Sequence, residues 1–301
     1  MISFSTVVPS YNSWRTVART LDSLLLQPEE LLQQIVVVDS SDDDKTRAVL
    51  EKFRINRVRL IYLEKKTMPA VGRNIGAEHA SGELLAFIDS DAYAAEDWAA
   101  AIIKACEQGH PVGGGAILLP PEQRKNSLAL AQYFLQFNEF MEGQRRSLVK
   151  FVPSCNLFCE KKFFNEIGGF PEIRASEDVL FGLKVNEKTA FIFDPAIRVY
   201  HIFREEKQSY FQNQKMLGKY ILIYRRDFLK TRWFQGVWPV FLVPAIAAIK
   251  FLRISTQVFF SGWRMFFCYL ESLPLFLAGL FFWCAGFVDA VFEKTDLKGN
   301  G

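Results

Sequence analysis

The chain has 301 residues, half of them hydrophobic, with a formal charge of only +3 at pH 7. This length suits one large domain or two ordinary ones, and so weak a charge with no long basic block argues against a nucleic-acid-binding protein. Five cysteines without a CxxC pair argue against a disulfide framework, and three widely spaced histidines argue against a zinc cluster.

The N-terminal third alternates between strand-like and helix-like segments. The opening MISFSTVVPSYN has no basic n-region, so we expect no signal peptide and a cytosolic N-terminal part. Strands are predicted in FSTVVPSYN, LQQIVVVDSS, VRLIYLE and ELLAFIDSD, and helices in SWRTVARTLDSLLLQ, DKTRAVLEKF and MPAVGRNIGAEHA. The strands are continuous apolar runs, which is typical of a parallel sheet covered on both faces. We therefore predict an α/β fold with a doubly wound, mostly parallel sheet.

Polar residues follow these strands where each one ends. Tyr11 follows the first, Asp39 ends the second, and Asp89 and Asp91 end the fourth. Ligands of such sheets bind at the carboxyl ends of the strands, and clustered carboxylates there suit Mg²⁺ or Mn²⁺ with a phosphorylated substrate. An isolated Asp-x-Asp is more often a solvated loop that caps a helix. Because no phosphate-binding glycine loop follows the first strand, P-loop NTPases and dinucleotide-binding dehydrogenases are disfavoured.

The C-terminal part is rich in phenylalanine and poor in charge. The segments 236–252 and 272–292 resemble membrane segments, and the second approaches the roughly 20 residues that cross a bilayer. The first contains two prolines and could be a kinked span, a re-entrant piece or an interfacial helix. A soluble pair of Phe-rich core helices is the alternative. The preceding YRRDFLKTRW places basic residues beside the membrane, which predicts the cytoplasmic face of the plasma (inner) membrane.

Five segments, taken in order, resemble family-two inverting glycosyltransferases of the GT-A fold. They are VVPSYN, IVVVDSSDDDKT, GRNIGAEHASGELLAFIDSDA, NLFCEKKFFNEIGGFPE and SEDVLFGLKV. The later VYHIFREEKQSYFQNQKMLGKY is similar to membrane-associated members that build bacterial exopolysaccharides or envelope saccharides. The resemblance implies a GT-A domain over 1–230, with a nucleotide-sugar-binding half (1–120) and an acceptor and catalytic half (121–230). Membrane-associated helices would occupy 231–301.

The resemblance assigns several residues to the nucleotide-sugar donor. The residues that would hold the nucleotide are Pro9, Tyr11 and Asp39. A carboxylate such as Asp39 can accept a hydrogen bond from a ribose hydroxyl or from a base N–H. Arg73 matches a position near the diphosphate, where a guanidinium fork is well suited, and Arg204 would help there. A helix cap for Asp39 and surface salt bridges for the arginines are the structural alternatives.

The resemblance also implies a divalent metal, Mn²⁺ or Mg²⁺. Asp91 would bind the ion that bridges the two phosphates of the donor, and Asp89 would contact ribose or a water on the metal. His201 matches a histidine that completes the metal shell in some members, and a plain core histidine is an equal alternative.

The segment SEDV carries the remaining chemistry. Inversion needs a base on the face opposite the departing diphosphate, and Asp178 matches the catalytic Asp of the family. Glu177 would orient an acceptor hydroxyl. The alternative is that both acids only begin a helix, whose first turn favours negative charge.

Two departures from the family pattern refine the prediction. The loop DSSDDDKT replaces the commoner Asp-Asp-Gly-Ser, so Asp42, Asp43 and Asp44 receive no role. The Gln-x-x-Arg-Trp signature of processive synthases is missing, which favours transfer of one sugar per encounter.

We therefore predict a metal-dependent inverting glycosyltransferase that moves one sugar, from a UDP-sugar above all, to an acceptor hydroxyl on a lipid-linked or cell-envelope saccharide. A polyprenyl-phosphate monosaccharide synthase is the close alternative, although its ionised phosphate acceptor needs no base. A sugar nucleotidylyltransferase would want a Gly-rich first loop with Arg or Lys, which VPSYNSWR lacks. A degenerate, non-enzymatic domain is disfavoured by the intact acids.

Overall fold

The computed structural model of the protein describes residues 2–293, which divide into two compact units. Unit 1 comprises residues up to Leu118 and Glu142–Ile202, and unit 2 comprises Leu119–Met141 and the chain from Phe203 onward. The sequence composition predicts a boundary near residue 230. In the structure, the helix 207–223 and the segment 119–141 make most of their contacts with the C-terminal helices and belong to unit 2.

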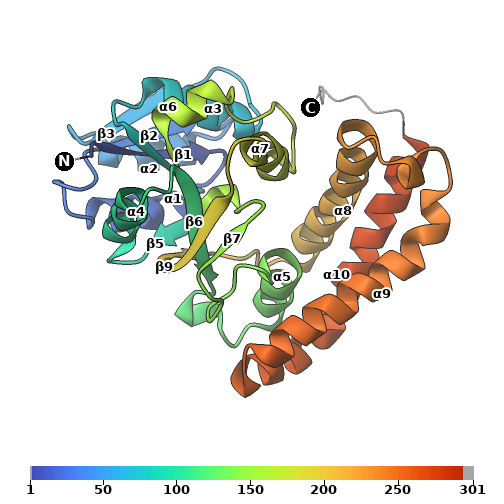
Figure 1. Ribbon diagram of the computed structural model, residues 1–301. Helices are drawn as coiled ribbons and strands as arrows, with labels where there is room; N and C mark the ends of the chain where they lie inside the picture. The colour runs from blue at the N-terminus through green and yellow to red at the C-terminus, as the bar shows by residue number, and fades with distance from the viewer. Residues whose placement is uncertain (1, 294–301) are drawn as a thin grey trace. The chain divides into compact units, whose positions relative to one another are not determined.

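Unit 1 is built on one nine-stranded sheet (Figure 1). The order of the main path is β3-β2-β1-β4-β8-β6-β9-β5, and β7 pairs with β9. The strands are β1 (Phe4–Ser10), β2 (Gln34–Asp39), β3 (Val58–Tyr62), β4 (Leu84–Phe87), β5 (Ala92–Ala94), β6 (Val112–Leu118), β7 (Ser147–Val149), β8 (Leu157–Glu160) and β9 (Phe191–His201).

The N-terminal half of this sheet confirms the predicted parallel arrangement. β1 runs parallel to β2 and β4, and β2 runs parallel to β3. β1, β2 and β4 are buried almost throughout, as expected for strands with helices on both faces. In the second half β8 enters antiparallel to both β4 and β6, so the sheet is mixed.

Helices cover both faces of the unit 1 sheet: α3 and α6 lie on one face, and α1, α2 and α4 on the other (Figure 1). α1 buries Val17, Leu21 and Leu24 at helical spacing. Asp43 caps α2 by accepting a hydrogen bond from the Thr46 N–H at 2.6 Å. The unit 1 helices are α1 (Val17–Leu25), α2 (Asp44–Leu50), α3 (Pro69–His79), α4 (Trp98–Glu107), α6 (Lys161–Glu166) and α7 (Glu177–Asn186).

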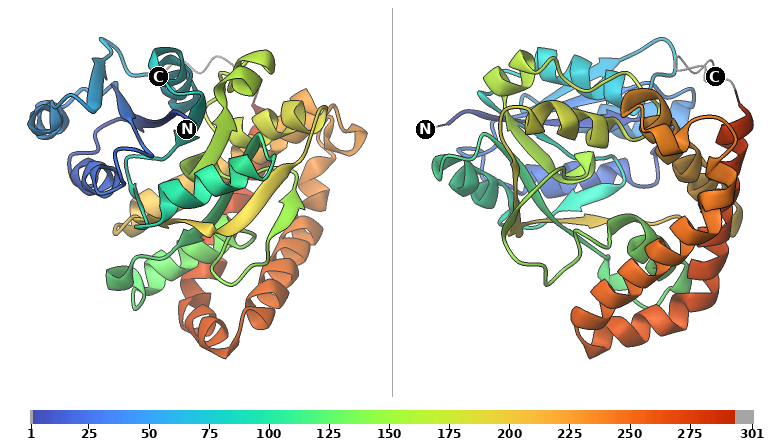
Figure 2. Two further views of the ribbon diagram at one scale, coloured as in Figure 1. Left: turned by 60° about the vertical axis from the view of Figure 1, so that its left-hand side comes forward. Right: turned by 45° about the vertical axis from the view of Figure 1, so that its right-hand side comes forward.

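Unit 2 is helical, with α9 and α10 forming the antiparallel hairpin visible in both views of Figure 2. Its helices are α5 (Ser127–Phe137), α8 (Lys207–Ile223), α9 (Pro239–Phe260) and α10 (Trp263–Phe292). Both α9 and α10 are long and apolar enough to cross a membrane, by length and composition. α8 and α10 touch backbone to backbone, because a Cβ on Gly218 would lie 1.8 Å from the Trp283 carbonyl oxygen.

Candidate functional site

The first part of the site lies where β1 and β2 end. The parallel register places Ser10 beside Asp39, which is only 1% exposed. The Ser10 and Ser41 hydroxyls both donate to Asp39 Oδ1, at 2.8 and 2.6 Å. Asp39 Oδ2 is buried and has no hydrogen-bond partner among the described residues. One oxygen of this carboxylate is therefore held in place, and the other is available to accept a hydrogen bond from a ligand.

Asp42, which has no role in the sequence prediction, joins the two loops that follow β1 and β2. The Tyr11 hydroxyl donates to Asp42 Oδ2 at 2.9 Å, and the Asn12 amide donates to Oδ1 at 2.7 Å. The hydrogen bond with Asp42 raises the pKa of Tyr11, and the bonds from Asn12 and Tyr11 lower the pKa of Asp42. Pro9 lies deeper in β1 and faces α3 at Gly72. No local pattern separates Asp42 from Asp43 and Asp44, because its partners Tyr11 and Asn12 lie in another loop.

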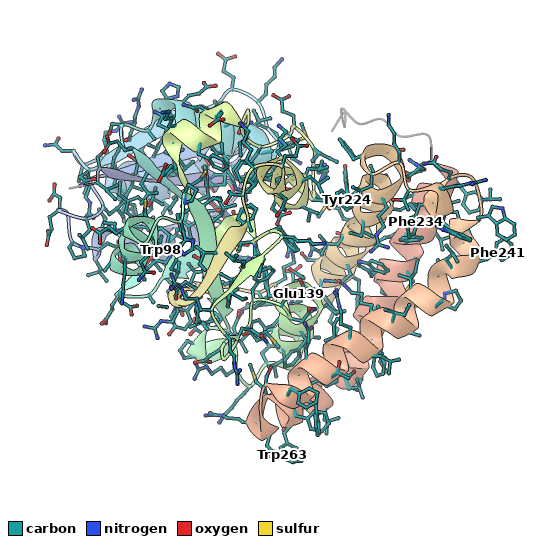
Figure 3. All side chains as sticks on the ribbon, in the orientation of Figure 1. Trp98, Glu139, Tyr224, Phe234, Phe241 and Trp263 are labelled. Atoms are coloured by element: carbon teal, nitrogen blue, oxygen red, sulfur yellow. The ribbon has the colours of Figure 1, made fainter. Side chains whose placement is uncertain are left out.

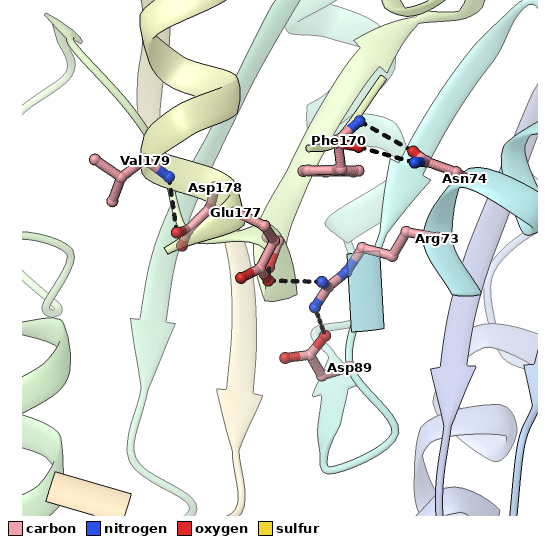
Figure 4. Close-up of polar contacts among 8 residues, drawn as sticks. Arg73, Asn74, Asp89, Phe170, Glu177, Asp178 and Val179 are labelled. Carbon is pink, nitrogen blue, oxygen red and sulfur yellow. Dashed lines mark hydrogen bonds and ion pairs between the residues drawn. The ribbon is translucent and has the colours of Figure 1, made fainter. Parts of the chain in front are cut away.

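Arg73 on α3 is buried between two carboxylates (Figure 4). Its guanidinium donates to Asp89 Oδ1 at 2.5 Å and to Glu177 Oε1 at 2.8 Å, and the side chain is 2% exposed. Burial alone would lower the pKa of Arg73, but Asp89 and Glu177 outweigh it and raise that pKa. Arg73 therefore connects the end of β4 to the start of α7, and its contact with Glu177 joins two residues that are 104 positions apart in the chain.

Removing this buried cation should destabilise the protein strongly. Arg73→Met would leave Asp89 and Glu177 without their shared partner, which should cost about 3–5 kcal/mol of the free energy of unfolding. Chemical denaturation of the variant measures this loss. Arg54→Met is the matched control, because Arg54 forms an exposed pair with Glu51 and its removal should leave stability nearly unchanged. Equal losses in the two variants would contradict a central role for the Arg73 pairs.

Asp89, Asp91 and His201 form the second part of the site. Their ligating atoms lie within 4.8 Å of one another, and His201 Nε2 is 3.6 Å from Asp91 Oδ1. The pairing of β5 with β9 brings them together, because Ala92 faces His201 and the Ile202 N–H donates to the Asp91 carbonyl at 2.7 Å. Two carboxylates and an imidazole suit Mn²⁺, so the donor set fits the predicted metal.

The third part of the site is the first turn of α7, where both predicted acids lie. It follows Ser176, whose φ of 68° is left-handed and uncommon for a residue with a side chain. Glu177 is buried and paired with Arg73. Asp178 is partly buried, and its Oδ1 accepts the Val179 N–H at 2.8 Å. Burial, followed by the charge of Glu177, raises the pKa of Asp178 to about 7.

The raised pKa of Asp178 predicts a pH-dependent cost to stability. The folded protein keeps this proton up to about pH 7, whereas the unfolded chain releases it near the ordinary value of about 3.9. The folded state therefore binds more protons between these values, and its stability falls as pH rises through them. Asp178→Asn should melt at a higher temperature than the unmodified protein at pH 8, with the difference shrinking towards pH 4. A difference independent of pH would contradict the shift.

Of the remaining predicted residues, Arg204 belongs to unit 2. Gln132 holds its backbone there, with the amide donating to the Arg204 carbonyl at 2.8 Å. Its place near the diphosphate stays a prediction. Asn74 exchanges two hydrogen bonds with the backbone of Phe170, at 2.9 and 3.0 Å, and ties α3 to the loop before α7 (Figure 4).

The chain is similar to proteins of a known family and fold. Residues 5–168, more than half of the chain, match glycosyl transferase family 2. The chain is 36% identical over 97 residues to poly(ribitol-phosphate) beta-N-acetylglucosaminyltransferase TarS of Staphylococcus aureus, covering 31% of this chain and 17% of that protein. It is 36% identical over 87 residues to UDP-Glc:alpha-D-GlcNAc-diphosphoundecaprenol beta-1,3-glucosyltransferase WfgD of Escherichia coli, covering 29% of this chain and 34% of that protein. The match thus spans only a part of each relative.

Solved structures show the same fold. A mannosyltransferase from Pyrobaculum calidifontis, solved with GDP-Man and Mn²⁺, has a TM-score of 0.61 and 17% identity, covering 98% of this chain and 88% of that one. GalNAc-T7, solved with UDP, GalNAc and Mn²⁺, has a TM-score of 0.60 and 19% identity, covering 80% of this chain and 51% of that one. The predicted GT-A fold is confirmed, and the chain belongs to glycosyl transferase family 2.

Proposed function

We propose that the protein is a metal-dependent inverting enzyme that moves one sugar from a UDP-sugar to a hydroxyl of a lipid-linked or cell-envelope saccharide. The observation that carries this proposal is the chain of contacts from Asp89 through Arg73 to Glu177, which neighbours Asp178. It joins the candidate metal ligands to a carboxylate whose pKa of about 7 suits a general base.

The names of the relatives support the donor and the acceptor class. The Escherichia coli relative is named for transfer from UDP-Glc to a diphosphoundecaprenol-linked sugar, and the Staphylococcus aureus relative for transfer to poly(ribitol-phosphate). A further relative in Bacillus subtilis is named as a putative teichuronic acid biosynthesis glycosyltransferase. The Escherichia coli name supports the UDP-sugar donor, and the three names together support an acceptor among lipid-linked or cell-envelope glycans.

The residues of this chain suggest how the proposed transfer proceeds. Asp178, in its ionised form, takes the proton of the acceptor hydroxyl as the oxygen attacks the anomeric carbon. The bond from that carbon to the diphosphate breaks on the opposite face, and the configuration inverts. Glu177 is fixed by Arg73, which suits it to orient the acceptor rather than to accept the proton. The unpartnered oxygen of Asp39 would accept a hydrogen bond from the nucleotide.

We propose Asp91 and His201 as ligands of a Mn²⁺ or Mg²⁺ ion, with Asp89 beside them. The bound ion would offset the charge that develops on the leaving nucleoside diphosphate. Because Asp89 is already engaged by Arg73, we assign it to ribose or to a water on the metal, and Asp91 to the ion itself.

Donor hydrolysis tests the proposal. Purified full-length protein should slowly release the nucleoside diphosphate from one or a few nucleotide sugars in a panel supplied with Mn²⁺. UDP-sugars should be the best substrates, and the preferred one identifies the sugar. A panel without any hydrolysis, measured with protein that binds UDP, would contradict the proposal.

The choice of acceptor separates this proposal from the polyprenyl-phosphate synthase alternative. Asp178→Asn should strongly lower transfer to a hydroxyl, whereas an ionised phosphate acceptor needs no base and its glycosylation should persist. Transfer of the sugar to polyprenyl phosphate by the Asp178→Asn protein would favour the alternative.

We also propose that the protein associates with the cytoplasmic face of the plasma (inner) membrane through α9 and α10. Full-length protein should sediment with membranes after cell lysis, because both helices expose large apolar side chains. Removing α9 and α10 is no suitable control, since α5 and α8 pack against α10 and would lose their cover. Full-length protein that stays in the supernatant without detergent would contradict membrane association.

A further inference from the structure

α9 carries an unbroken apolar stripe on its exposed side. Its large exposed side chains recur at helical spacing. Only 11% of the most apolar 18-residue stretch of the helix is buried. They are Phe241, Ile249, Leu252, Phe259 and Phe260. The Thr256 hydroxyl donates back to the Leu252 carbonyl at 2.9 Å, so it presents no unmet polar group. In Figure 3 the labelled Phe241 points away from α10.

α10 carries a second exposed stripe that continues around the turn at Ser261–Gly262. Six exposed apolar residues are spaced by three and four, namely Trp263, Phe267, Leu270, Pro274, Leu277 and Phe281, and Glu271 next to Leu270 is exposed as well. The turn itself is an aromatic cluster, in which Phe259 contacts Trp263 and Phe266. Trp263 is 70% exposed and Phe260 83%. So much exposed aromatic surface marks an interaction site.

The charges in the middle of α9 have partners on the protein, although the Arg253 side chain is 53% exposed. Lys250 Nζ lies 5.0 Å from the ring centre of Trp283 on α10. Arg253 pairs with Glu139, just after α5, at 2.9 Å. The stripe can therefore enter an apolar phase without stripping water from an unpaired charge.

α5 covers the first half of α10 and is itself unsuited to a bilayer core. Phe134 on α5 packs edge-on against Tyr269 at 5.3 Å between ring centres. α5 has only 11 residues, about 16 Å of helix, against roughly 30 Å of hydrocarbon. Charged residues lie on both sides of it, in PPEQRKN before and MEGQRR after. A hairpin that crossed the membrane would draw these charges into the hydrocarbon.

α8 covers the second half of α10 and, because it carries charge, is also unsuited to a bilayer core. Lys215 on α8 pairs with Asp289 on α10 at 2.6 Å, and Lys219 pairs with Glu293. The backbone contacts at Gly218 and Gly286 leave no room for lipid between the two helices. α10 is therefore lined by α5, which charged segments flank, and by α8, which carries charge itself, although the composition of α10 alone is that of a spanning helix.

The region that would meet the membrane is also cationic. Between Tyr224 and Arg264 lie seven basic residues and one acidic residue, a formal charge of +6 in a chain whose total is +3. Lys230 and Arg232 are exposed near Trp233 and Trp238 in the chain, and Arg264 is exposed next to Trp263. Cations and tryptophans at the edge of an apolar face match an anionic lipid surface.

We infer that α9 and α10 do not cross the bilayer, and that their exposed stripes lie in the near leaflet of a membrane rich in anionic lipid. This inference rests on the membrane association of the proposed function and replaces a transmembrane hairpin with an anchor in one leaflet. The turn at Ser261 then stays on the same side of the membrane as unit 1.

Thiol labelling in intact bacterial cells tests the position of the turn. Ser261→Cys is made in full-length protein in which Cys106, Cys268 and Cys284 are serine, while Cys155 and Cys159 stay because they are buried. A membrane-impermeant maleimide should modify Cys at 261 in inside-out vesicles and not in intact cells. Lys52→Cys, exposed on unit 1, is the matched control and should behave identically. Modification at 261 in intact cells, with Lys52→Cys unmodified, would overturn the inference.

Binding to preformed vesicles tests the lipid partner. Full-length protein, diluted from detergent, should bind vesicles rich in phosphatidylglycerol and bind pure phosphatidylcholine far more weakly. Lys230→Gln with Arg232→Gln should weaken binding to the anionic vesicles roughly 30-fold. Lys52→Gln with Lys162→Gln makes the same charge change elsewhere on the surface and should have no such effect.

The other outcomes separate the inference from the proposed function. Equal affinity for both vesicle types would overturn the inference. A stable dimer that no longer binds vesicles would also overturn it, because a second copy of the chain would then cover this face. Absence of the protein from membranes altogether would remove the membrane association on which the inference rests. Donor hydrolysis is measured separately, so either result leaves the proposed chemistry intact.

Discussion

Asp178→Asn should lower turnover by roughly 10²- to 10⁴-fold while the affinity for the donor stays near normal. The acceptor hydroxyl is a poor nucleophile until its proton is removed, and asparagine keeps the shape of Asp178 without its basicity. The amide oxygen can still accept the Val179 N–H, so the first turn of α7 should be preserved. Steady-state kinetics together with donor titration separate the two effects.

Two comparisons make this result specific. The same variant should be more stable than the unmodified protein at pH 8, so its loss of turnover would not come from unfolding. Asp22→Asn, on the exposed side of α1, should leave turnover unchanged. If Asp178 only begins a helix, asparagine should replace it well, because Asn and Asp are about equally good there. Near-normal turnover of Asp178→Asn would therefore leave only the helix-cap role.

Asp91→Ala should cost roughly 10³-fold in turnover and also weaken binding of the donor in Mn²⁺. A metal at the diphosphate contributes several kcal/mol to the transition state, and Asp91 is the most exposed carboxylate of the cluster with His201. Kinetics and donor titration with and without Mn²⁺ measure both effects. The variant should respond little to added metal.

Removal of the metal from the unmodified protein tests the same proposal without a substitution. EDTA should abolish its turnover, and Mn²⁺ should restore it, whereas Asp22→Ala should match it in both conditions. His201→Ala should lose less than Asp91→Ala, because a water can replace one imidazole ligand. Full turnover of the unmodified protein in EDTA would end the metal proposal.

The fold could be predicted from the sequence where the chain pattern is local. The apolar runs that end at Ser10 and Asp39 are β1 and β2, because burial of a strand on both faces leaves a continuous hydrophobic run. The segment between them contains α1, as predicted. The antiparallel entry of β8 was not predicted. Its direction depends on partners at β4 and β6, more than 38 residues earlier in the chain, and not on its own composition.

The site residues at the ends of strands could be predicted from the sequence, but the contacts between residues of different elements could not. Asp89 and Asp91 follow a strand directly, so their position is a local matter. The contacts of Arg73 with Asp89 and Glu177 depend on how α3 and α7 face each other, and no periodicity encodes that. Asp42 illustrates the same limit, since its partners Tyr11 and Asn12 come from another loop.

The division of unit 2 into two stretches of chain has a consequence for synthesis. α5 leaves the ribosome early, whereas α10 begins at Trp263, about 126 residues after α5 ends at Phe137. At roughly 5–20 residues per second, α5 waits about 6–25 s for the helix that covers Phe134. During that interval its aromatic residues are open to contact with other nascent chains, so slower translation of the C-terminal third should lower the yield of folded protein.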